Sequence, residues 1–348
     1  MYTIHMHDWN YIHNIYESDM PAYLRELIQC PSLQRIDGVD MNCGMQYSSF
    51  PLFLKIHPYS RLQHSIGVSL IIEHFTHSAK QSIAGLFHDI STPVFSHVID
   101  FLMNDYEHQE YTESKIRDIL QQDQKLMDIL RKYNISLEDV QDYHMYTIAD
   151  NATPKLSADR LEYTLCNMVN YGFASADDIA PMYNDLCVGK NEYGEDEIVF
   201  QHEEYAKQFS RFMWQCAHVY VADEDRYGME YLARILKGMM ERETCTRNDF
   251  YTTEEEFLKY IAEDAIALEQ FHTFQSFTCI RECSSEESGA LCVHAKKRYI
   301  DPYVLNQGRL SSVDIEMENK IAHFKNLNFE YYIKGYKEYL TIRKSRDK

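Results

Sequence analysis

The sequence contains little glycine or proline and has a deficit of positive charge. Only 12 glycines and 8 prolines occur in 348 residues, which excludes collagen-like, low-complexity and disordered chains. The 34 lysines and arginines are outnumbered by 54 acids, and the formal net charge is −20. Because binding to a phosphate backbone needs clustered positive charge, we expect no extended nucleic acid as a partner.

Long apolar runs are missing as well. The longest, such as residues 68–72, are far shorter than the roughly 18 residues of a membrane span, and the first ten residues do not resemble a signal sequence. Nine cysteines, an odd number, are scattered from Cys30 to Cys292, as is typical of reduced thiols. We therefore expect a cytoplasmic protein without a membrane partner.

The residues that are present predict a helical fold with a sizeable core. Hydrophobic residues make up 45% of the chain, and apolar residues recur at spacings of three and four, which favours helices. One β-hairpin is expected within residues 184–201, where apolar triplets flank a polar loop with glycine. The expected helices cover residues 60–78, 82–90, 203–221, 227–242, 253–271 and 313–339.

The fold class expected is therefore all-α. We expect a helical core over residues 1–180 and a second, mostly helical region over residues 181–348 that packs on it, with the small hairpin near the boundary. The length alone agrees with about two domains. Because no flexible linker marks the boundary, a single domain remains an alternative.

One predicted helix has a polar face suited to a cavity. Ser157 is a candidate N-cap, and apolar residues after it gather on one side of the helix. On the other side, within about 80° of one another, lie four polar side chains: Asp159, Tyr163, Asn167 and Asn170. A carboxylate, a phenol and two amides suit a metal at one end and a hydroxylated ligand along the face.

Four residues have the chemistry of metal ligands: His64, the adjacent pair His88 and Asp89, and Asp159. Imidazole and carboxylate together suit a divalent ion such as Mn, Fe, Zn, Ni or Mg and leave room for water. Taken separately, each also has a purely structural explanation. A histidine on an apolar stripe is usually a hydrogen-bonded core residue, and an aspartate near a helix start is usually a cap.

Several segments, in order and with matching spacing, resemble the HD-domain phosphohydrolases, and specifically the branch that contains deoxynucleoside triphosphate triphosphohydrolases. The resemblance covers about residues 20–245 and rests on segments 30–35, 57–68, 84–90, 94–97, 158–163 and 197–220. It implies an all-helical HD-domain core with one divalent metal ion, where a metal-activated water or oxygen attacks phosphorus. It also implies a homo-oligomer.

The resemblance implies roles for individual residues. Arg61 matches an arginine beside the metal that pairs with substrate phosphate. His108 resembles a histidine that touches the leaving phosphate or donates a proton. Asp159 counts as catalytic because it also holds the metal. The implied metal ligands are His64, His88, Asp89 and Asp159.

Other residues are expected on the substrate side. Tyr163 looks like a residue that packs on a sugar, and Gln34 is expected near it. Asn167 and Asn170 lie on the same polar helix face and are expected to line the substrate cavity.

The chain also departs from the family pattern. Thr92 stands where the triphosphohydrolases carry a histidine, and Asn167 where they carry an aspartate. Acids occupy residues 223–225, where basic residues are expected for a phosphate chain. His97 and Asp100 look like supporting residues. These departures leave the expected metal centre intact, whereas they argue against specificity for a triphosphate.

Two further patterns are weaker candidates. Residues 279–294 contain three cysteines and a histidine that could bind zinc, although buried free thiols are the more common explanation: Cys279, Cys283, Cys292 and His294. Residues 296–298, Lys-Lys-Arg, form the only tight basic run. A solvated loop is its default explanation, and contact with a phosphate is the alternative.

We expect a metal-dependent phosphohydrolase of a small phosphorylated substrate, with a nucleotide ahead of other substrates. The alternatives are a phosphomonoesterase or phosphodiesterase with the same metal centre, and a nucleotide sensor without catalysis.

Overall fold

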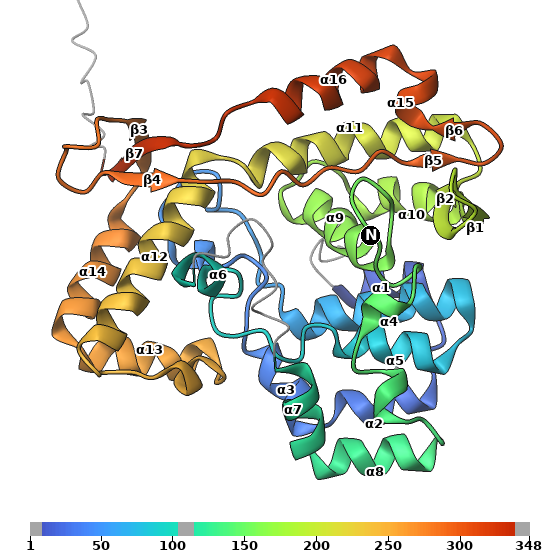
Figure 1. Cartoon of the computed structure of the whole chain (residues 1–348), viewed down its shortest axis with the longest axis horizontal. Coiled ribbons are helices and arrows are strands. Elements are labelled where there is room, and N and C mark those ends of the chain that lie inside the picture. The colour runs from blue at the N-terminus through green and yellow to red at the C-terminus, as the bar shows by residue number, and fades with distance from the viewer. Residues whose placement is uncertain (1–8, 104–114, 338–348) are drawn as a thin grey trace, which may run out of the picture.

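The structure is a computed structural model that describes residues 9–103 and 115–337. A helical body occupies most of it, and two small sheets lie at opposite edges (Figure 1). The expectation of an all-α fold holds for this body and needs correction for the sheets. Among the described residues, no helix combines the length and the apolar composition needed to cross a bilayer.

The first half of the chain forms the helices around the candidate site. They are α1 (Trp9–Tyr16), α2 (Ala22–Ile28), α3 (Pro31–Asp37), η1 (Met45–Tyr47), α4 (Arg61–Thr76), α5 (Ala79–Phe87), α6 (Val98–Leu102), α7 (Ile116–Gln122), α8 (Gln124–Lys132), η3 (Leu137–Asp139), η4 (Tyr143–Met145), α9 (Ala158–Asn170) and α10 (Ala176–Asn184).

The second half adds longer helices. They are α11 (Glu203–Val219), α12 (Asp223–Glu241), η5 (Arg247–Phe250), α13 (Glu254–Glu263), α14 (Ala265–Ser276), α15 (Leu310–Val313) and α16 (Ile315–Asn326). The strands are β1 (Leu186–Lys190), β2 (Asp196–Phe200), β3 (Cys279–Glu282), β4 (Leu291–Val293), β5 (Tyr303–Val304), β6 (Gly308–Arg309) and β7 (Tyr331–Tyr336).

Local signals explain where the two central helices begin. The Ser60 hydroxyl accepts a hydrogen bond from the Gln63 amide at 3.1 Å, and the Ser60 amide donates to the Gln63 side chain at 2.8 Å. This capping box starts α4 at Arg61. The Ser157 hydroxyl likewise accepts from the Arg160 amide at 3.3 Å and starts α9.

The predicted hairpin is confirmed and belongs to a larger sheet. Strands β1 and β2 pair antiparallel, from Leu186 opposite Phe200 to Lys190 opposite Asp196. Distant chain extends this sheet, because β5 pairs parallel to β2 and β6 follows antiparallel, giving the order β1-β2-β5-β6.

The second sheet corrects the helix expected over residues 313–339. The helix α16 ends at Asn326, and residues Tyr331–Tyr336 form β7, the middle strand in the order β3-β7-β4. β7 pairs with β3 over residues 333–336 and with β4 over residues 331–333, and Ile333, which is paired on both sides, is fully buried. These long-range pairs override the local helical pattern.

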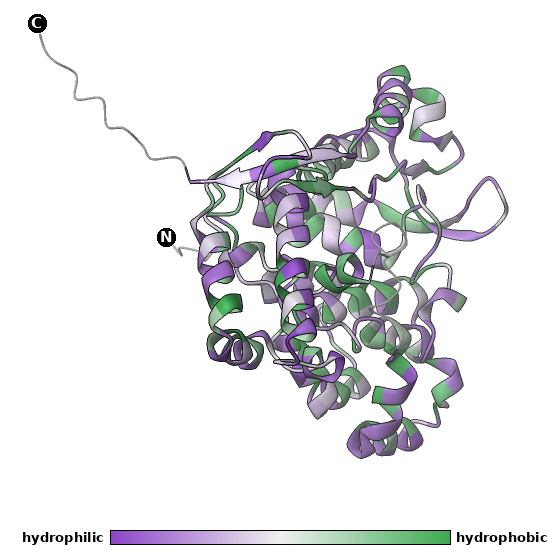
Figure 2. Ribbon diagram, turned by 60° about the vertical axis from the view of Figure 1, so that its left-hand side comes forward, coloured by the Kyte–Doolittle hydropathy of each residue, from purple (hydrophilic) through white to green (hydrophobic). Residues whose placement is uncertain are grey.

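Two apolar clusters form the core. One surrounds α4, α5, α9 and α11, and the other surrounds α12, α14 and the sheet β3-β7-β4. Hydrophobic residues run through the interior of the helical body, and hydrophilic residues dominate its rim (Figure 2). Each cluster contains residues from both sides of residue 180, so the two expected regions share their packing. The domain boundary itself stays a prediction.

The chain between β4 and β5 crosses the molecule in extended form from one sheet toward the other (Figure 1). It packs along α11, where the Tyr299 ring stacks on Trp214 with centroids 6.2 Å apart. Phe324 of α16 meets the same tryptophan edge-on at 5.4 Å. The crossing thus places a distant part of the sequence along α11.

Candidate active site

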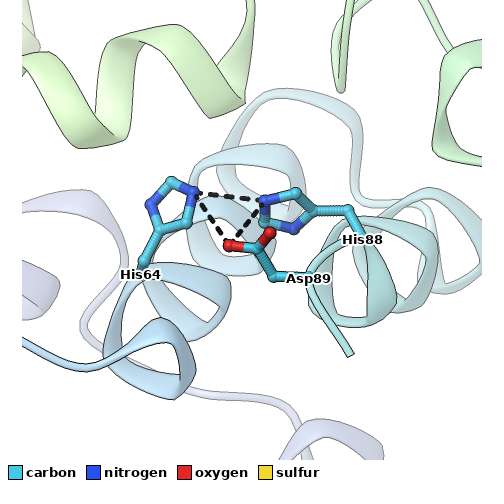
Figure 3. Close-up of side chains that lie close together, drawn as sticks. All are labelled: His64, His88 and Asp89. Atoms are coloured by element: carbon cyan, nitrogen blue, oxygen red, sulfur yellow. Dashed lines mark hydrogen bonds and ion pairs between the residues drawn. The ribbon is translucent and has the colours of Figure 1, made fainter. Parts of the chain in front are cut away.

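The helix α4, the end of α5 and the start of α9 bring the candidate metal ligands together. Ligand atoms of His64, His88 and Asp89 all lie within 4.8 Å of one another (Figure 3). The two Nε2 atoms are 3.1 Å apart. Asp159 completes the group, because its Oδ1 lies 3.0 Å from Nε2 of His64 and 3.7 Å from Nε2 of His88.

The hydrogen bonds of the imidazoles fit a cation. Nδ1 of His88 donates to the Gly85 carbonyl at 2.7 Å, and Nδ1 of His64 donates to Oε2 of Glu162 at 2.5 Å. In the neutral form of each ring the proton is therefore on Nδ1, and Nε2 presents a lone pair to the cluster. Two such lone pairs 3.1 Å apart, beside two carboxylates, would repel one another, so the cluster requires a positive charge, either a second proton on His64 or a bound cation. The donor set fits a divalent metal ion.

The pKa values reflect the same crowding of negative charge. Burial lowers the pKa of His64, but Glu162 and Asp159 outweigh that effect and raise it to about 10. Burial raises the pKa of Asp89, but Arg61 and the two histidines outweigh it and hold this pKa well below its usual value. The pocket therefore favours a cation at its centre.

Both oxygens of Asp89 are held in place. Oδ2 accepts from Nη1 of Arg61 at 2.9 Å, and Oδ1 accepts from the Thr92 hydroxyl at 2.8 Å. The Arg61 Nε donates to the Ser96 hydroxyl at 3.0 Å. Phe95 and Ser96 have positive φ angles of 58° and 53°, a strained turn that sets Ser96 against the arginine. Thr92, the departure noted in the sequence, thus orients a candidate metal ligand.

Glu162 is a functional residue that the sequence reasoning missed. It is fully buried on α9, accepts from His64, and also accepts from the Tyr59 hydroxyl and from the Cys166 thiol at 3.0 Å. A signal was available, because Glu162 lies on the apolar side of its helix. An acid there needs partners.

Gly67 of α4 permits this arrangement. A Cβ atom at this position would lie 2.4 Å from Oε1 of Glu162 and 2.7 Å from its Cγ. Since the contact is far inside van der Waals distance, only glycine lets the Glu162 side chain lie against α4.

A cavity of about 370 Å³ opens from the metal ligands. Arg61, Asp159, Tyr163 and Asn167 line it, so three of the four residues on the predicted polar face of α9 reach it. The Tyr163 ring meets the Tyr220 ring edge-on, with centroids 6.1 Å apart. The Asn167 amide donates to the Tyr220 hydroxyl at 2.9 Å. This wall offers aromatic faces and polar groups to a ligand.

The basic run Lys296–Arg298, called the basic segment below, also lines the cavity. All three of its residues are half-buried, which corrects the solvated loop that was its default explanation. The Arg298 charge acts on two groups across the cavity. Burial raises the pKa of Tyr163, to about 12, and that of Asp225, and Arg298 opposes both shifts. The basic segment therefore supplies positive charge to the same cavity as the metal ligands.

Other predicted site residues lie elsewhere. Asn170 is buried, and its side chain bonds to the His57 backbone at 2.7 and 3.4 Å. The Gln34 amide donates to the Ile28 carbonyl at 2.8 Å. Among the described residues, neither belongs to the cavity lining. His97 does line it, and its Nδ1 donates to buried Asp100 at 2.9 Å.

His108 lies outside the described residues, so its expected role stays a prediction.

Comparisons with known proteins agree with this geometry. Residues 61–152 match the family model of the HD domain, a segment that contains three of the four candidate ligands. The Uncharacterized protein YdhJ of Bacillus subtilis is 29% identical over 242 residues, which cover 68% of this chain and 70% of that protein. The Metal-dependent phosphohydrolase cns2 of Cordyceps militaris is 30% identical over 164 residues.

The alignment with cns2 covers 47% of this chain and 45% of that relative. Together the matches support an HD-domain phosphohydrolase and imply a divalent metal.

Proposed function

We propose that this protein is a metal-dependent phosphohydrolase of a small phosphorylated substrate, and that the substrate is a nucleotide. One observation carries the proposal: a single cavity contains both the four candidate metal ligands and the basic segment. A donor set for a cation next to arginine and lysine is the arrangement that phosphoryl transfer requires.

The chain's own residues divide the work. His64, His88, Asp89 and Asp159 would hold the ion, which when bound lowers the pKa of a coordinated water and polarises a phosphoryl group. Glu162 fixes His64 with Nε2 as the ligand atom. Arg61, whose pKa is raised above its usual value mainly by Asp89 against the effect of burial, keeps its charge and neutralises charge that develops on the phosphate.

The cavity wall supports a nucleotide. Its volume of about 370 Å³ falls in the range of small-ligand sites. The rings of Tyr163 and Tyr220 can pack on a sugar or base, and Asn167 offers an amide to hydroxyl groups. Opposite charge for the phosphates comes from Arg61 and the basic segment.

A phosphomonoesterase acting on another small ester is the second candidate, and Asp225 favours it. This acid also lines the cavity. Burial raises its pKa to about 7, although Arg298 and Arg226 oppose the shift. A long polyphosphate beside this carboxyl group would meet repulsion whenever the group ionises. A single phosphate held at the metal would not have to approach it.

The test is a hydrolysis screen of the purified protein with Mn²⁺, Fe²⁺, Zn²⁺, Ni²⁺ and Mg²⁺. Nucleotides and sugar phosphates are offered, and release of phosphate, pyrophosphate and triphosphate is measured separately. We expect turnover of a nucleotide, and loss of both bound metal and turnover in Asp89→Ala. Full activity in that variant would refute the metal centre.

Thermal stabilisation by nucleotides without any product would instead support a nucleotide sensor. Light scattering tests the expected homo-oligomer, which stays a prediction.

A further inference from the structure

A second cluster of metal-ligating side chains lies at one end of the sheet β3-β7-β4, where β4 ends and β7 begins. Ligand atoms of Cys292, His294 and Glu330 lie within 4.8 Å of one another. Cys292 and His294 are half-buried, and Glu330 is exposed. The cluster lies where the extended crossing leaves β4 (Figure 1). Its ligand atoms come from different residues and different elements than those of the centre at His64.

The strand register explains why the three side chains converge. Cys292 pairs with Tyr332 and Val293 with Tyr331, so continuing the antiparallel register by one residue places His294 opposite Glu330. Cys292 lies on β4 and His294 follows the end of this strand, so in extended chain the two side chains, two residues apart, point to the same face. Directly opposed and diagonal neighbours on one face of a sheet come into side-chain contact.

Packing on the other face holds this strand in place. Leu291 is 4% exposed and Val293 is fully buried, which directs the alternate residue, Cys292, to the opposite face. The Glu330 backbone is fixed as well, because its amide donates to the Asn328 side chain at 3.0 Å and its carbonyl accepts from the same side chain at 3.3 Å. The three ligand-bearing positions are therefore set by the fold before any ion arrives.

We propose that Cys292, His294 and Glu330 form a second metal site that binds Zn²⁺. A thiolate, an imidazole and a carboxylate together suit this borderline ion better than Mg²⁺ or Ca²⁺, which prefer oxygen ligands only. Three protein ligands leave the fourth tetrahedral position to water or to another group.

This site differs from the zinc pattern considered in the sequence. That pattern combined His294 with three cysteines, but Cys279 lies on β3 and Cys283 follows it, with β7 between them and β4. Glu330, which lies 36 residues after His294 in the sequence, takes their place in the cluster. The three cysteines are also half-buried rather than buried, which corrects the alternative explanation of buried thiols.

The ion would anchor the basic segment. His294 lies two residues before Lys296 and lines the same cavity. Zinc at His294 ties the end of β4 to β7 and so fixes the point from which the basic segment enters the cavity.

The experiment uses Co²⁺ as a spectroscopic substitute for Zn²⁺ in the full-length protein. A thiolate bound to Co²⁺ produces a charge-transfer absorption in the near ultraviolet. The centre at His64 has no sulfur among its candidate ligands, so it is silent in this measurement. We expect a band that saturates at an intensity of one thiolate–Co²⁺ site per chain and disappears when Zn²⁺ is added.

The variants assign the ligands. We expect Cys292→Ser to abolish the band, and Glu330→Gln and His294→Ala to weaken Co²⁺ binding at least tenfold. Cys283→Ser is the matched control and should leave the band intact, as should Asp89→Ala. Because Glu330 is exposed, its substitution is a test that does not depend on refolding around a changed core.

Absence of the band in the unmodified protein, its persistence in Cys292→Ser, or its loss in Cys283→Ser would each overturn the proposal. The measurement requires no hydrolysis, so its result is independent of the proposed function.

Discussion

Nδ1 of His64 donates a hydrogen bond to Oε2 of Glu162 over 2.5 Å, inside a part of the core where Glu162 is fully buried. The carboxylate selects the tautomer of the imidazole and aims Nε2 at Asp159 and His88. A residue that cannot reach a metal itself therefore determines how one candidate ligand presents its lone pair.

Replacing Glu162 by glutamine should weaken metal binding by roughly 10- to 100-fold. The amide keeps the shape of the side chain but removes the negative charge that stabilises the Nδ1 proton of His64. Isothermal titration with Mn²⁺ measures the change. The exposed residue Glu204 on α11 provides the control, since Glu204→Gln changes the net charge equally and lies on the surface. Equal affinities for the two variants would contradict this role.

Replacing Arg298 by glutamine should raise the KM for a phosphorylated substrate by about tenfold or more, because a hydrogen bond to a charged group contributes roughly 1.5–3 kcal/mol. The guanidinium lowers the pKa values of Tyr163 and Asp225 across the cavity. The metal ligands belong to other elements, so metal content should not change. Steady-state kinetics at low and high salt check this, with metal content measured in parallel. A fall in kcat at unchanged KM would speak against phosphate binding.

The carboxyl group of Asp225 should make substrate binding depend on pH. Burial raises its pKa to about 7, so the group is neutral below pH 7 and negative above it. An anionic substrate should therefore bind more weakly as the pH rises through 7, by roughly tenfold if one pKa unit of interaction is lost. Asp225→Asn should lack this step. The ratio of KM values for the two proteins, measured on either side of pH 7, removes the ionisation of the substrate from the comparison.

Glu254 should make the free energy of unfolding depend on pH. Burial and then Asp40 raise its pKa to about 7 from an ordinary value of 4.5. The folded protein keeps this proton between those values, whereas the unfolded chain releases it, so stability falls as the pH rises from about 4.5 to about 7. The group accounts for roughly 3 kcal/mol across that range.

Chemical denaturation of Glu254→Gln at several pH values measures this contribution. The wild-type protein should lose stability relative to the variant over this pH range. Parallel curves for the two proteins would show that Glu254 titrates normally. Its contacts with the Gln46 amide and the Tyr47 hydroxyl, at 2.7 and 2.8 Å, can be kept by glutamine because both partners can reverse their hydrogen-bonding roles.

The parts of the fold that sequence patterns predicted are those with local causes. Ser60 and Ser157 are the N-caps of α4 and α9, and each accepts a hydrogen bond from the amide three residues later. The hairpin β1-β2 has its two strands and its turn in one short segment. The helical pattern over β7 is misleading because the partners of this strand lie near residues 280 and 292, and no local pattern reveals pairing over that separation.

In the candidate site, too, the sequence predicts the features that have local causes and misses those that depend on distant segments. His88 and Asp89 are adjacent in the sequence, and the placement of Tyr163 one turn after Asp159 follows from helix geometry. The entry of the basic segment into the cavity does not, because it depends on the path of the extended crossing between two sheets. Asn170 shares the polar face of α9, yet the His57 backbone occupies its amide. Helical periodicity predicts the side of the helix on which a side chain lies, whereas the packing of other segments determines what that side chain contacts.

Gly67 affects the candidate metal site although it is not a ligand, because its lack of a side chain leaves room for Glu162. An added methyl group would push Glu162 away, and the disturbance would travel through His64 to whatever ion is held there. Natural variation at position 67 should therefore be tied to variation at position 162: homologues with a larger residue at 67 should carry a shorter or uncharged one at 162, or orient the histidine by some other means.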